Sequence, residues 1–190
     1  MVRKILRRLL PKAVFIVNNR KAIQKVISKE KTINQNLSLR QAETADEAFL
    51  ETVYADTRRG ELAMLNWSRE QEDAFFKMQF QIQTRAYRMQ FPDAVYYVIE
   101  FDKTPVGRLI VERGERGINL IDISLLAQFR SRGIGTFFLE KLKAEAAAGG
   151  KDLFLRVFKT NVSAQRLYER LGFAIVENAD LYFAMRWQNS

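Results

Sequence analysis

The stretch Leu125-Leu126-Ala127-Gln128-Phe129-Arg130-Ser131-Arg132-Gly133-Ile134-Gly135-Thr136 joins an apolar segment to a basic turn that contains two glycines. Residues 118–125 alternate apolar with polar side chains, which predicts a strand with one buried face. Apolar residues at helical spacing come after the turn, and Gly149-Gly150 supplies a stop, so a helix is expected there. The stretch is therefore predicted to be a strand-to-helix junction.

A junction of this kind can hold a phosphate group. Gly133 and Gly135 leave room for a ligand near the backbone, and the first amides of a helix have no partner within the helix. Arg130 and Arg132 add positive charge, so a pyrophosphate is the natural ligand. By itself, the pattern R-x-x-G-x-G is also typical of an ordinary tight turn. It matches neither the P-loop nor the three-glycine dinucleotide fingerprint.

Two downstream segments make the pattern more specific. Residues 152–158 read as a second buried strand, and the run Asn161-Val162-Ser163-Ala164-Gln165-Arg166-Leu167-Tyr168-Glu169-Arg170-Leu171-Gly172-Phe173 reads as a short, glycine-ended helix. Together with the glycine turn, this run resembles the GNAT superfamily of N-acetyltransferases over about residues 37–190. The resemblance implies an α/β (α+β) fold with a mixed, mostly antiparallel sheet of about six or seven strands and helices on both faces.

The charge of the chain is unevenly distributed. The net charge of +9 arises in residues 1–36, which hold ten Lys and Arg residues and one acid, so residues 37–190 are neutral. We expect a basic amphipathic extension over residues 1–36 and an N-acetyltransferase domain over residues 37–190. The extension reads as a loosely ordered tail or as the product of a misplaced start, as a segment that contacts an anionic membrane or a partner, or as an organellar transit peptide. The neutral domain argues against nucleic acid as a partner.

Composition excludes several kinds of chemistry. The chain has no cysteine and no histidine, which removes disulfides, thiol nucleophiles, histidine bases and ordinary zinc sites. The carboxylates show no clustered ligand spacing, so no metal is expected. No apolar run is long enough to span a bilayer, and we expect a soluble, cytoplasmic protein. The oligomeric state is left open, with a homodimer as one option.

The remaining elements are predicted from turn and capping signals. We expect an edge strand over residues 37–42, a capping box over Thr44–Glu47 and a helix to about Thr57. A second box at Ser68–Gln71 opens a longer helix that ends before Pro92. Strands over residues 94–101 and 106–113 form a hairpin around residues 102–105, and the last two strands span residues 173–176 and 181–187. The aromatic stripe of the long helix is expected in the core, and it consists of Phe75, Phe76, Phe80, Ile82 and Tyr87.

The resemblance also implies a site for acetyl-CoA as a cosubstrate. Backbone groups of Leu125, Leu126 and Ala127 would bind the pantetheine arm. Asn161 would hydrogen-bond the arm, or it acts only as a helix N-cap. The pyrophosphate would be bound by the turn residues Arg130, Ser131, Arg132, Gly133, Ile134, Gly135 and Thr136.

The implied reaction is direct attack of a primary amine, on a small molecule or a protein, on the thioester. Tyr168 matches the family position of the proton donor to the leaving thiolate, and the alternative is a packed aromatic. Asp122 or Glu112 could accept a proton through water, but each is also typical of a solvent-facing strand residue; backbone carbonyls with water are a further option. The alternative function is a non-catalytic acyl-CoA sensor or scaffold that the basic tail directs to its target.

The acceptor pocket is expected between residues 58–67, the long helix and the final hairpin. Tyr54, Trp67 and Tyr87 could face an acceptor, or they pack between helices. Glu61 could attract a cationic amine, or it is an ordinary loop residue.

Overall fold

The computed structural model describes residues 36–62 and 64–189. The basic extension expected over residues 1–36 lies outside the described residues, apart from Asn36. Residues 37–190 form one unit of the chain. Among the helices that the structure describes, none is long and apolar enough to cross a membrane.

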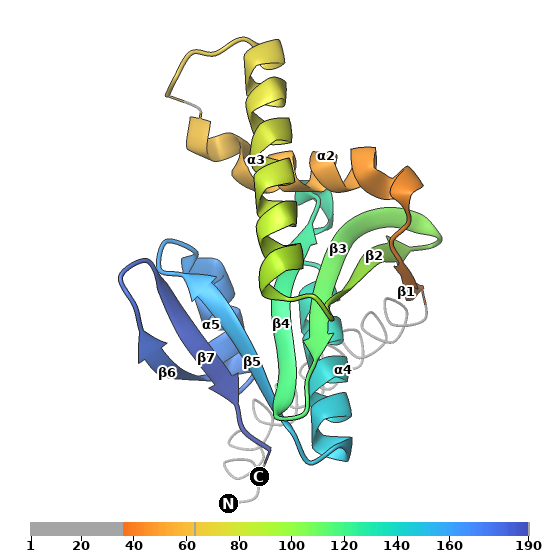
Figure 1. Ribbon diagram of the computed structural model, residues 1–190, viewed down its shortest axis with the longest axis vertical. Helices are drawn as coiled ribbons and strands as arrows, with labels where there is room; N and C mark the ends of the chain where they lie inside the picture. The colour runs from red at the N-terminus through yellow and green to blue at the C-terminus, as the bar shows by residue number, and fades with distance from the viewer. Residues whose placement is uncertain (1–35, 63, 190) are drawn as a thin grey trace, which may run out of the picture. The chain divides into compact units, whose positions relative to one another are not determined.

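Seven strands form one sheet in the spatial order β1-β2-β3-β4-β5-β7-β6 (Figure 1). Among these described strands, β4 and β5 are parallel and the other neighbouring pairs are antiparallel. The predicted mixed, mostly antiparallel sheet is therefore confirmed. The strands are β1 (Leu37–Gln41), β2 (Val95–Phe101), β3 (Thr104–Arg113), β4 (Gly117–Leu125), β5 (Asp152–Phe158), β6 (Ala174–Asn178) and β7 (Tyr182–Trp187).

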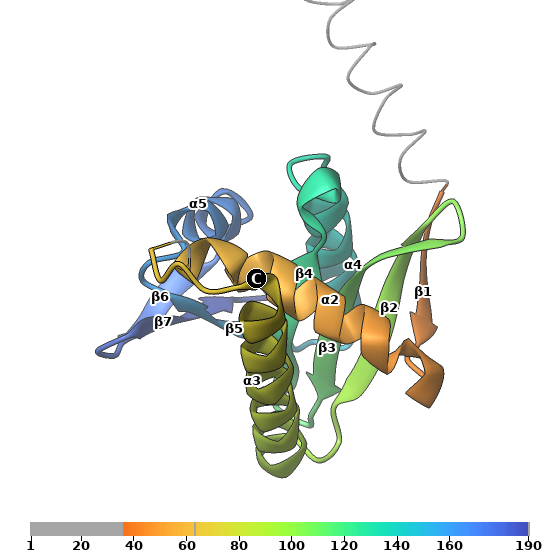
Figure 2. The same cartoon turned by 90° about the horizontal axis from the view of Figure 1, so that it is seen from above.

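Helices cover both faces of the sheet, as expected. Figure 2 shows α2 (Glu47–Arg58) and α3 (Arg69–Gln90) on one side, with α4 (Ile134–Ala148) and α5 (Val162–Arg170) on the other. Strand β3 contacts both layers because successive side chains point to opposite faces. Its Arg108 donates a hydrogen bond to Gln83 of α3, and its Arg113 pairs with Glu145 of α4.

The parallel pairing of β4 with β5 is short. It runs from Gly117 opposite Asp152 to Leu120 opposite Leu155 and then stops. At the same level, β4 carries a bulge: Leu120 lies opposite Val111 and Asp122 opposite Ile110, which leaves Ile121 without a partner. Beyond the bulge, β4 stays paired with β3 and β5 with β7. The sheet therefore opens between the C-terminal ends of its two central strands.

The bulge corrects one prediction. We expected one face of residues 118–125 to be buried through Ile121, Ile123 and Leu125, with Asp122 facing solvent. Instead, Ile118 and Leu120 are buried, and all residues from 121 to 125 are only half-buried. A bulge shifts side-chain alternation by one residue, and the loss of pairing with β5 exposes the rest of β4.

The helix starts and the hairpin turn agree with local chemistry, with one shift. The first cap is one residue earlier than predicted: Asp46 accepts from the amide of Glu43 at 2.8 Å, a 3-10 turn spans Thr44–Asp46, and α2 begins at Glu47. The box at Ser68 is confirmed, because its amide donates to Gln71 Oε1 and its hydroxyl accepts from the Gln71 amide. The hairpin turn has two residues instead of the four expected, because β3 already begins at Thr104. Its two residues, Asp102 and Lys103, both have positive φ, as a two-residue hairpin turn requires.

The aromatic stripe of α3 divides between core and surface. Phe76 and Phe80 are buried and pack against Tyr54 of α2, at ring separations of 6.5 and 5.9 Å. Ile82 was expected in this core, but it is 56% exposed. A helix buries only one stripe, and Ile82 lies two residues past Phe80, on the other side of that stripe.

An ion-pair cluster ties β1 to the start of α2. Arg40 contacts both oxygens of Asp46 at 2.6 Å and Glu100 of β2 at 2.8 Å. The Arg40 guanidinium, followed by the Glu43 amide, lowers the pKa of Asp46 from 3.8 to about 2. Because this pKa is lower in the folded state, the pair stabilises the fold fully above about pH 4, and the stabilisation is lost as the pH falls through about 2.

We predict that Asp46→Asn lowers the free energy of unfolding by about 1–2 kcal/mol at neutral pH, a value reduced for the partial exposure of Arg40. Urea denaturation at a series of pH values should show this difference shrinking below about pH 4. Asp73→Asn is the control, since Asp73 is half exposed and its two arginine contacts are at 3.3 and 3.9 Å. An equal loss of stability at every pH would contradict the assignment.

Candidate active site

The chain between β4 and α4 makes a tight turn with left-handed residues. Ala127–Phe129 form a 3-10 turn, Ser131 and Gly133 have φ of 58° and 86°, and Gly133 caps α4. Glycine suits position 133 because other L residues adopt this φ at a cost. Gly135 is different: a Cβ there would meet nothing closer than Leu167 Cδ2 at 3.7 Å. The predicted junction is present, and its second glycine is not required by protein packing.

Six consecutive backbone N–H groups, from Ser131 to Thr136, have no acceptor among the described residues. The first amide after them, that of Phe137, donates to the Gly133 carbonyl at 2.9 Å. Successive amides near left-handed residues form concave anion sites, and the start of a helix adds partial positive charge. The six amides belong to residues 131–136, which are all the residues of the predicted pyrophosphate site except Arg130.

Arg130 has a different role from the one expected. Its guanidinium binds the Asp56 carboxylate at 2.6 Å, the Asp56 carbonyl at 3.1 Å and the Leu125 carbonyl at 2.9 Å. The same carboxylate accepts from the amide of Ala127 at 2.7 Å. Arg130 and Asp56 therefore clamp the turn to the C-terminal end of α2. Arg132 lies over the ring of Phe129 and has no acidic partner in the described part of the chain, so it retains its charge for a ligand.

Three of the backbone groups expected to bind the pantetheine arm are already engaged. The Leu125 carbonyl accepts from Arg130, and the Leu126 amide donates to the Val106 carbonyl at 3.0 Å. The Ala127 amide donates to Asp56. The Leu126 and Ala127 amides could bind an arm only by giving up these bonds, whereas the Leu125 amide points away from β3, toward the opening in the sheet. The role of this backbone in holding the cofactor stays a prediction.

Asn161 is the N-cap of helix α5. The Asn161 side-chain oxygen accepts from the Ala164 amide and from the Ser163 hydroxyl, both at 3.2 Å. The N-cap role is therefore present. The side-chain nitrogen donates to no group that the structure describes, which leaves it available for the predicted contact with the arm.

Tyr168 is buried, and its ring packs against Phe173 at 5.8 Å. Burial raises the pKa of its hydroxyl well above the ordinary value, and the negative charge of Asp122 adds to that rise. The group therefore stays protonated at neutral pH and can donate a proton or hydrogen bond. Packing is observed, and the donor role remains a prediction.

Asp122 is the centre of a charged network on β4. It pairs with Arg108 of β3 and accepts from the Ser124 hydroxyl at 2.6 Å. Its charge also raises the pKa of Tyr87, to about 12, although burial is the larger cause. Asp122 and Tyr168 thus approach the opening in the sheet from different elements, one on β4 and the other on α5.

Glu112 does not share this position. It lies opposite Asn119 and accepts from the Asn119 side chain at 2.8 Å. Asn119 is still within the closed part of the sheet, opposite Phe154 of β5. At about 3.3 Å per residue, this level is roughly 20 Å along β4 from Leu125. The structure therefore separates Glu112 from the glycine turn.

A direct comparison decides the family. The model of the acetyltransferase (GNAT) family matches residues 61–173, which include both the glycine turn and α5. The chain belongs to the GNAT acetyltransferase family. The resemblance and the enzyme class, N-acetyltransferase, are thereby confirmed. A search of curated proteins gave no match.

Solved structures share the fold of this GNAT protein. PaiA N-acetyltransferase from Thermoplasma acidophilum, in complex with coenzyme A, has a TM-score of 0.60 and 19% identity, over 80% of this chain and 98% of that one. The histone acetyltransferase HPA2 and related acetyltransferase from Corynebacterium glutamicum has a TM-score of 0.58 and 19% identity, over 82% and 97%. A Salmonella typhimurium acetyltransferase that modifies the N-terminal serine of ribosomal protein L7/L12 has a TM-score of 0.54 and 15% identity, over 80% and 92%.

A cavity of about 520 Å³ lies beside the open part of the sheet. The end of α3, strands β4 and β5, and the hairpin of β6 and β7 line it, with Tyr87, Glu177 and Tyr182 among the polar side chains. The long helix and the final hairpin thus border it as expected for an acceptor pocket, whereas residues 58–67 do not. Tyr54 is core, Trp67 packs on Phe75 and Glu61 pairs with Arg58.

Sequence reasoning missed Arg108, Gln83 and Asp56. Arg108 had a signal, because it is a single charge within the apolar run Val106-Gly107-Arg108-Leu109-Ile110-Val111. Such a residue in a buried strand needs a partner. No local sequence signal pointed to Asp56, because its partners lie more than 70 positions along the chain. In the part of the chain that the structure describes, no group of three or more acidic side chains could hold a metal ion.

We predict that Asp56→Ala loosens the glycine turn. Removal of the carboxylate leaves the Ala127 amide without its acceptor and the Arg130 guanidinium with backbone carbonyls alone, so hydrogen exchange at Ala127 should accelerate by about 10-fold or more. Asp56→Asn is the matched control, since its amide oxygen can still accept from Ala127. Unchanged exchange in Asp56→Ala would show that the clamp does not hold the turn.

Proposed function

We propose that this GNAT protein is an acetyl-CoA-dependent N-acetyltransferase that moves the acetyl group to a primary amine of a small molecule or protein. The row of unpaired amides from Ser131 to Thr136 carries the proposal. It follows β4, the strand that separates from β5 and carries Asp122.

The turn fits a pyrophosphate in three respects. It offers several N–H donors, a helix start and the unpaired charge of Arg132. Gly135 adds a fourth argument: packing leaves room for a side chain there, so its absence is explained by close approach of a ligand. The Thermoplasma relative, whose structure contains coenzyme A, supports the same cosubstrate here. Asn161 and the backbone of residues 125–127 would hold the pantetheine arm.

Acetyl-CoA supplies the activated acetyl group. The amine nitrogen of the acceptor attacks the thioester carbonyl carbon, the carbon–sulfur bond breaks and the sulfur leaves with the bonding pair. Tyr168 donates its proton to that sulfur, and its raised pKa keeps the hydroxyl protonated until the sulfur leaves. The nitrogen loses its extra proton to Asp122 through water, since each oxygen of this carboxylate keeps a second lone pair besides the bond to Arg108 or Ser124.

Asp122 is preferred to Glu112 as this proton acceptor. Asp122 lies beyond the last paired residue of β4 and β5, whereas Glu112 lies beside the closed part of the sheet. The negative charge of Asp122 would also attract a cationic amine before it loses its proton. We assign the cavity between α3 and the β6–β7 hairpin to the acceptor.

Protein amines are one acceptor class that the comparisons support. The Salmonella relative modifies the N-terminal serine of a ribosomal protein, and a Vibrio fischeri relative is named a ribosomal-protein-S5-alanine acetyltransferase. The cavity of about 520 Å³ could equally hold a small amine. The division of the chain at residue 36, the contacts of its basic extension and the cytoplasmic location stay predictions.

We predict that Gly135→Asp abolishes measurable acetyl-CoA binding by the full chain, because a carboxylate would stand among the amides that bind the pyrophosphate. Calorimetry should show a loss of about 100-fold or more. Gly135→Ala separates size from charge, and its fold is expected to be intact. Gly60→Asp is the charge control, since a Cβ there meets nothing within 4 Å. Unchanged binding in Gly135→Asp would rule out the turn as the pyrophosphate site.

We predict that Tyr168→Phe lowers kcat by about 100-fold with little change in acetyl-CoA affinity, because only the proton donor is lost. The ring contact with Phe173 is kept, so stability should change little. Steady-state kinetics against a panel of amines, with calorimetry alongside, measures both quantities. Wild-type turnover by the variant at every pH would exclude Tyr168 as the donor.

A further inference from the structure

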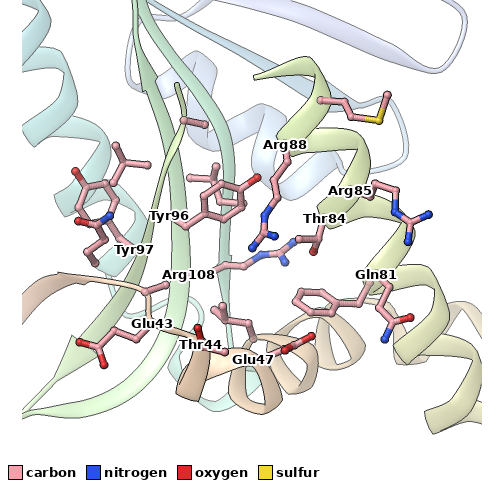
Figure 3. A pocket seen from close by; sticks show the side chains of 18 residues that line it. Glu43, Thr44, Glu47, Gln81, Thr84, Arg85, Arg88, Tyr96, Tyr97 and Arg108 are labelled. Atoms are coloured by element: carbon pink, nitrogen blue, oxygen red, sulfur yellow. The ribbon is translucent and has the colours of Figure 1, made fainter. Parts of the chain in front are cut away.

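A second and larger cavity lies on the other side of α3. It has a volume of about 910 Å³ and is bounded by the C-terminal half of α3, strands β1 to β3 and the turn before α2 (Figure 3). It shares no lining residue with the acceptor cavity. The reaction proposed above uses none of the side chains that line it except Arg108, which contacts Asp122.

Two buried polar groups of this cavity have no partner among the described residues. They are the Nε–H of Arg108 and the hydroxyl of Tyr96. The Arg108 side chain is only 6% exposed, and its Nη2 atom is already used by Asp122 and Gln83. A buried donor without an acceptor destabilises the fold, and native proteins seldom keep one without a use. Both residues line the same cavity, so an acceptor bound there would be a natural partner for the two groups.

The charges around these groups favour an anion. Figure 3 shows Arg88 of α3, Arg108 of β3 and Tyr96 of β2 directed into the space between helix and sheet. Burial raises the pKa of Tyr96, and the positive charges of Arg88 and Arg108 oppose that rise. The hydroxyl remains a donor at neutral pH.

The balance of charge and apolar surface narrows the class of ligand. Three arginines and two glutamates line the cavity, and Asp122 neutralises Arg108, so a polyphosphate finds too little positive charge there. A single carboxylate suits three donors, which are the Arg108 Nε–H, the Tyr96 hydroxyl and the Arg88 guanidinium. Leu50, Phe80, Val95 and Ile110 supply apolar walls for the rest of the molecule.

We propose that this cavity is a binding site for a small monocarboxylate with an apolar body. Its carboxylate accepts from Arg108 Nε, the Tyr96 hydroxyl and Arg88. The site does not depend on the function proposed above, although its Arg108 also contacts Asp122.

The test uses the full chain, labelled with ¹⁵N, without acetyl-CoA. Benzoate and hexanoate are titrated while the arginine Nε–H correlations are recorded, and benzamide serves as the uncharged analogue of benzoate. Saturable shifts of a single buried arginine Nε–H, with benzamide binding at least about 10-fold more weakly, are expected. Absence of saturable shifts with both carboxylates would overturn the proposal.

Two variants locate the site. Arg88→Gln is expected to weaken benzoate binding by about 10-fold or more, and Tyr96→Phe by about 3- to 10-fold. Arg69→Gln is the matched control, because Arg69 lies on the same helix, 79% exposed and outside the cavity. Tyr96→Phe should fold at least as stably as the wild type, since it removes an unpartnered hydroxyl. If benzoate binds both variants as tightly as the wild type, the carboxylate site is not in this cavity.

Discussion

The short pairing between β4 and β5 is the constraint on which the site depends. Two parallel strands that separate after Leu120 leave an opening in the middle of the sheet, with backbone on both sides. The opening stays ordered because each strand keeps its outer partner, β3 or β7. It places the glycine turn at the end of one strand and Asn161 shortly after the end of the other. A sheet paired along its full length would leave no such space.

Charge within the sheet is arranged around one buried pair. Arg108 and Asp122 lie on neighbouring strands and neutralise each other, which makes their burial tolerable. Burial and, to a smaller extent, the charge of Asp122 raise the pKa of Tyr168 and Tyr87, while the Nε–H of Arg108 has no acceptor in the described part of the chain. Asp122 lies on the part of β4 that borders the opening in the sheet, and its partner Arg108 lines the larger cavity. The pair therefore joins these two regions.

Most of the fold was predictable because its signals are local. The capping box at Ser68, the stop before Pro92 and the glycine turn each involve residues a few positions apart, and each is where the sequence indicated. The errors occurred where a neighbouring element decides the outcome. The bulge at Ile121 depends on the register with β3, and the exposure of Ile82 depends on which stripe of α3 meets α2. The cap before α2 was misplaced by one residue because Arg40 selects Asp46 as its partner.

The sequence by itself determined the strand, turn and helix around Gly133, the capped helix that carries Tyr168 and the family to which they belong, because these patterns are written in adjacent residues. Only the tertiary structure decided that Arg130 holds Asp56 rather than standing free, that Asp122 is paired with Arg108, and that Glu112 lies away from the turn. These contacts join residues from 7 to 74 positions apart. Their partners are chosen by which faces of helix and sheet meet, and periodicity carries no information about that choice.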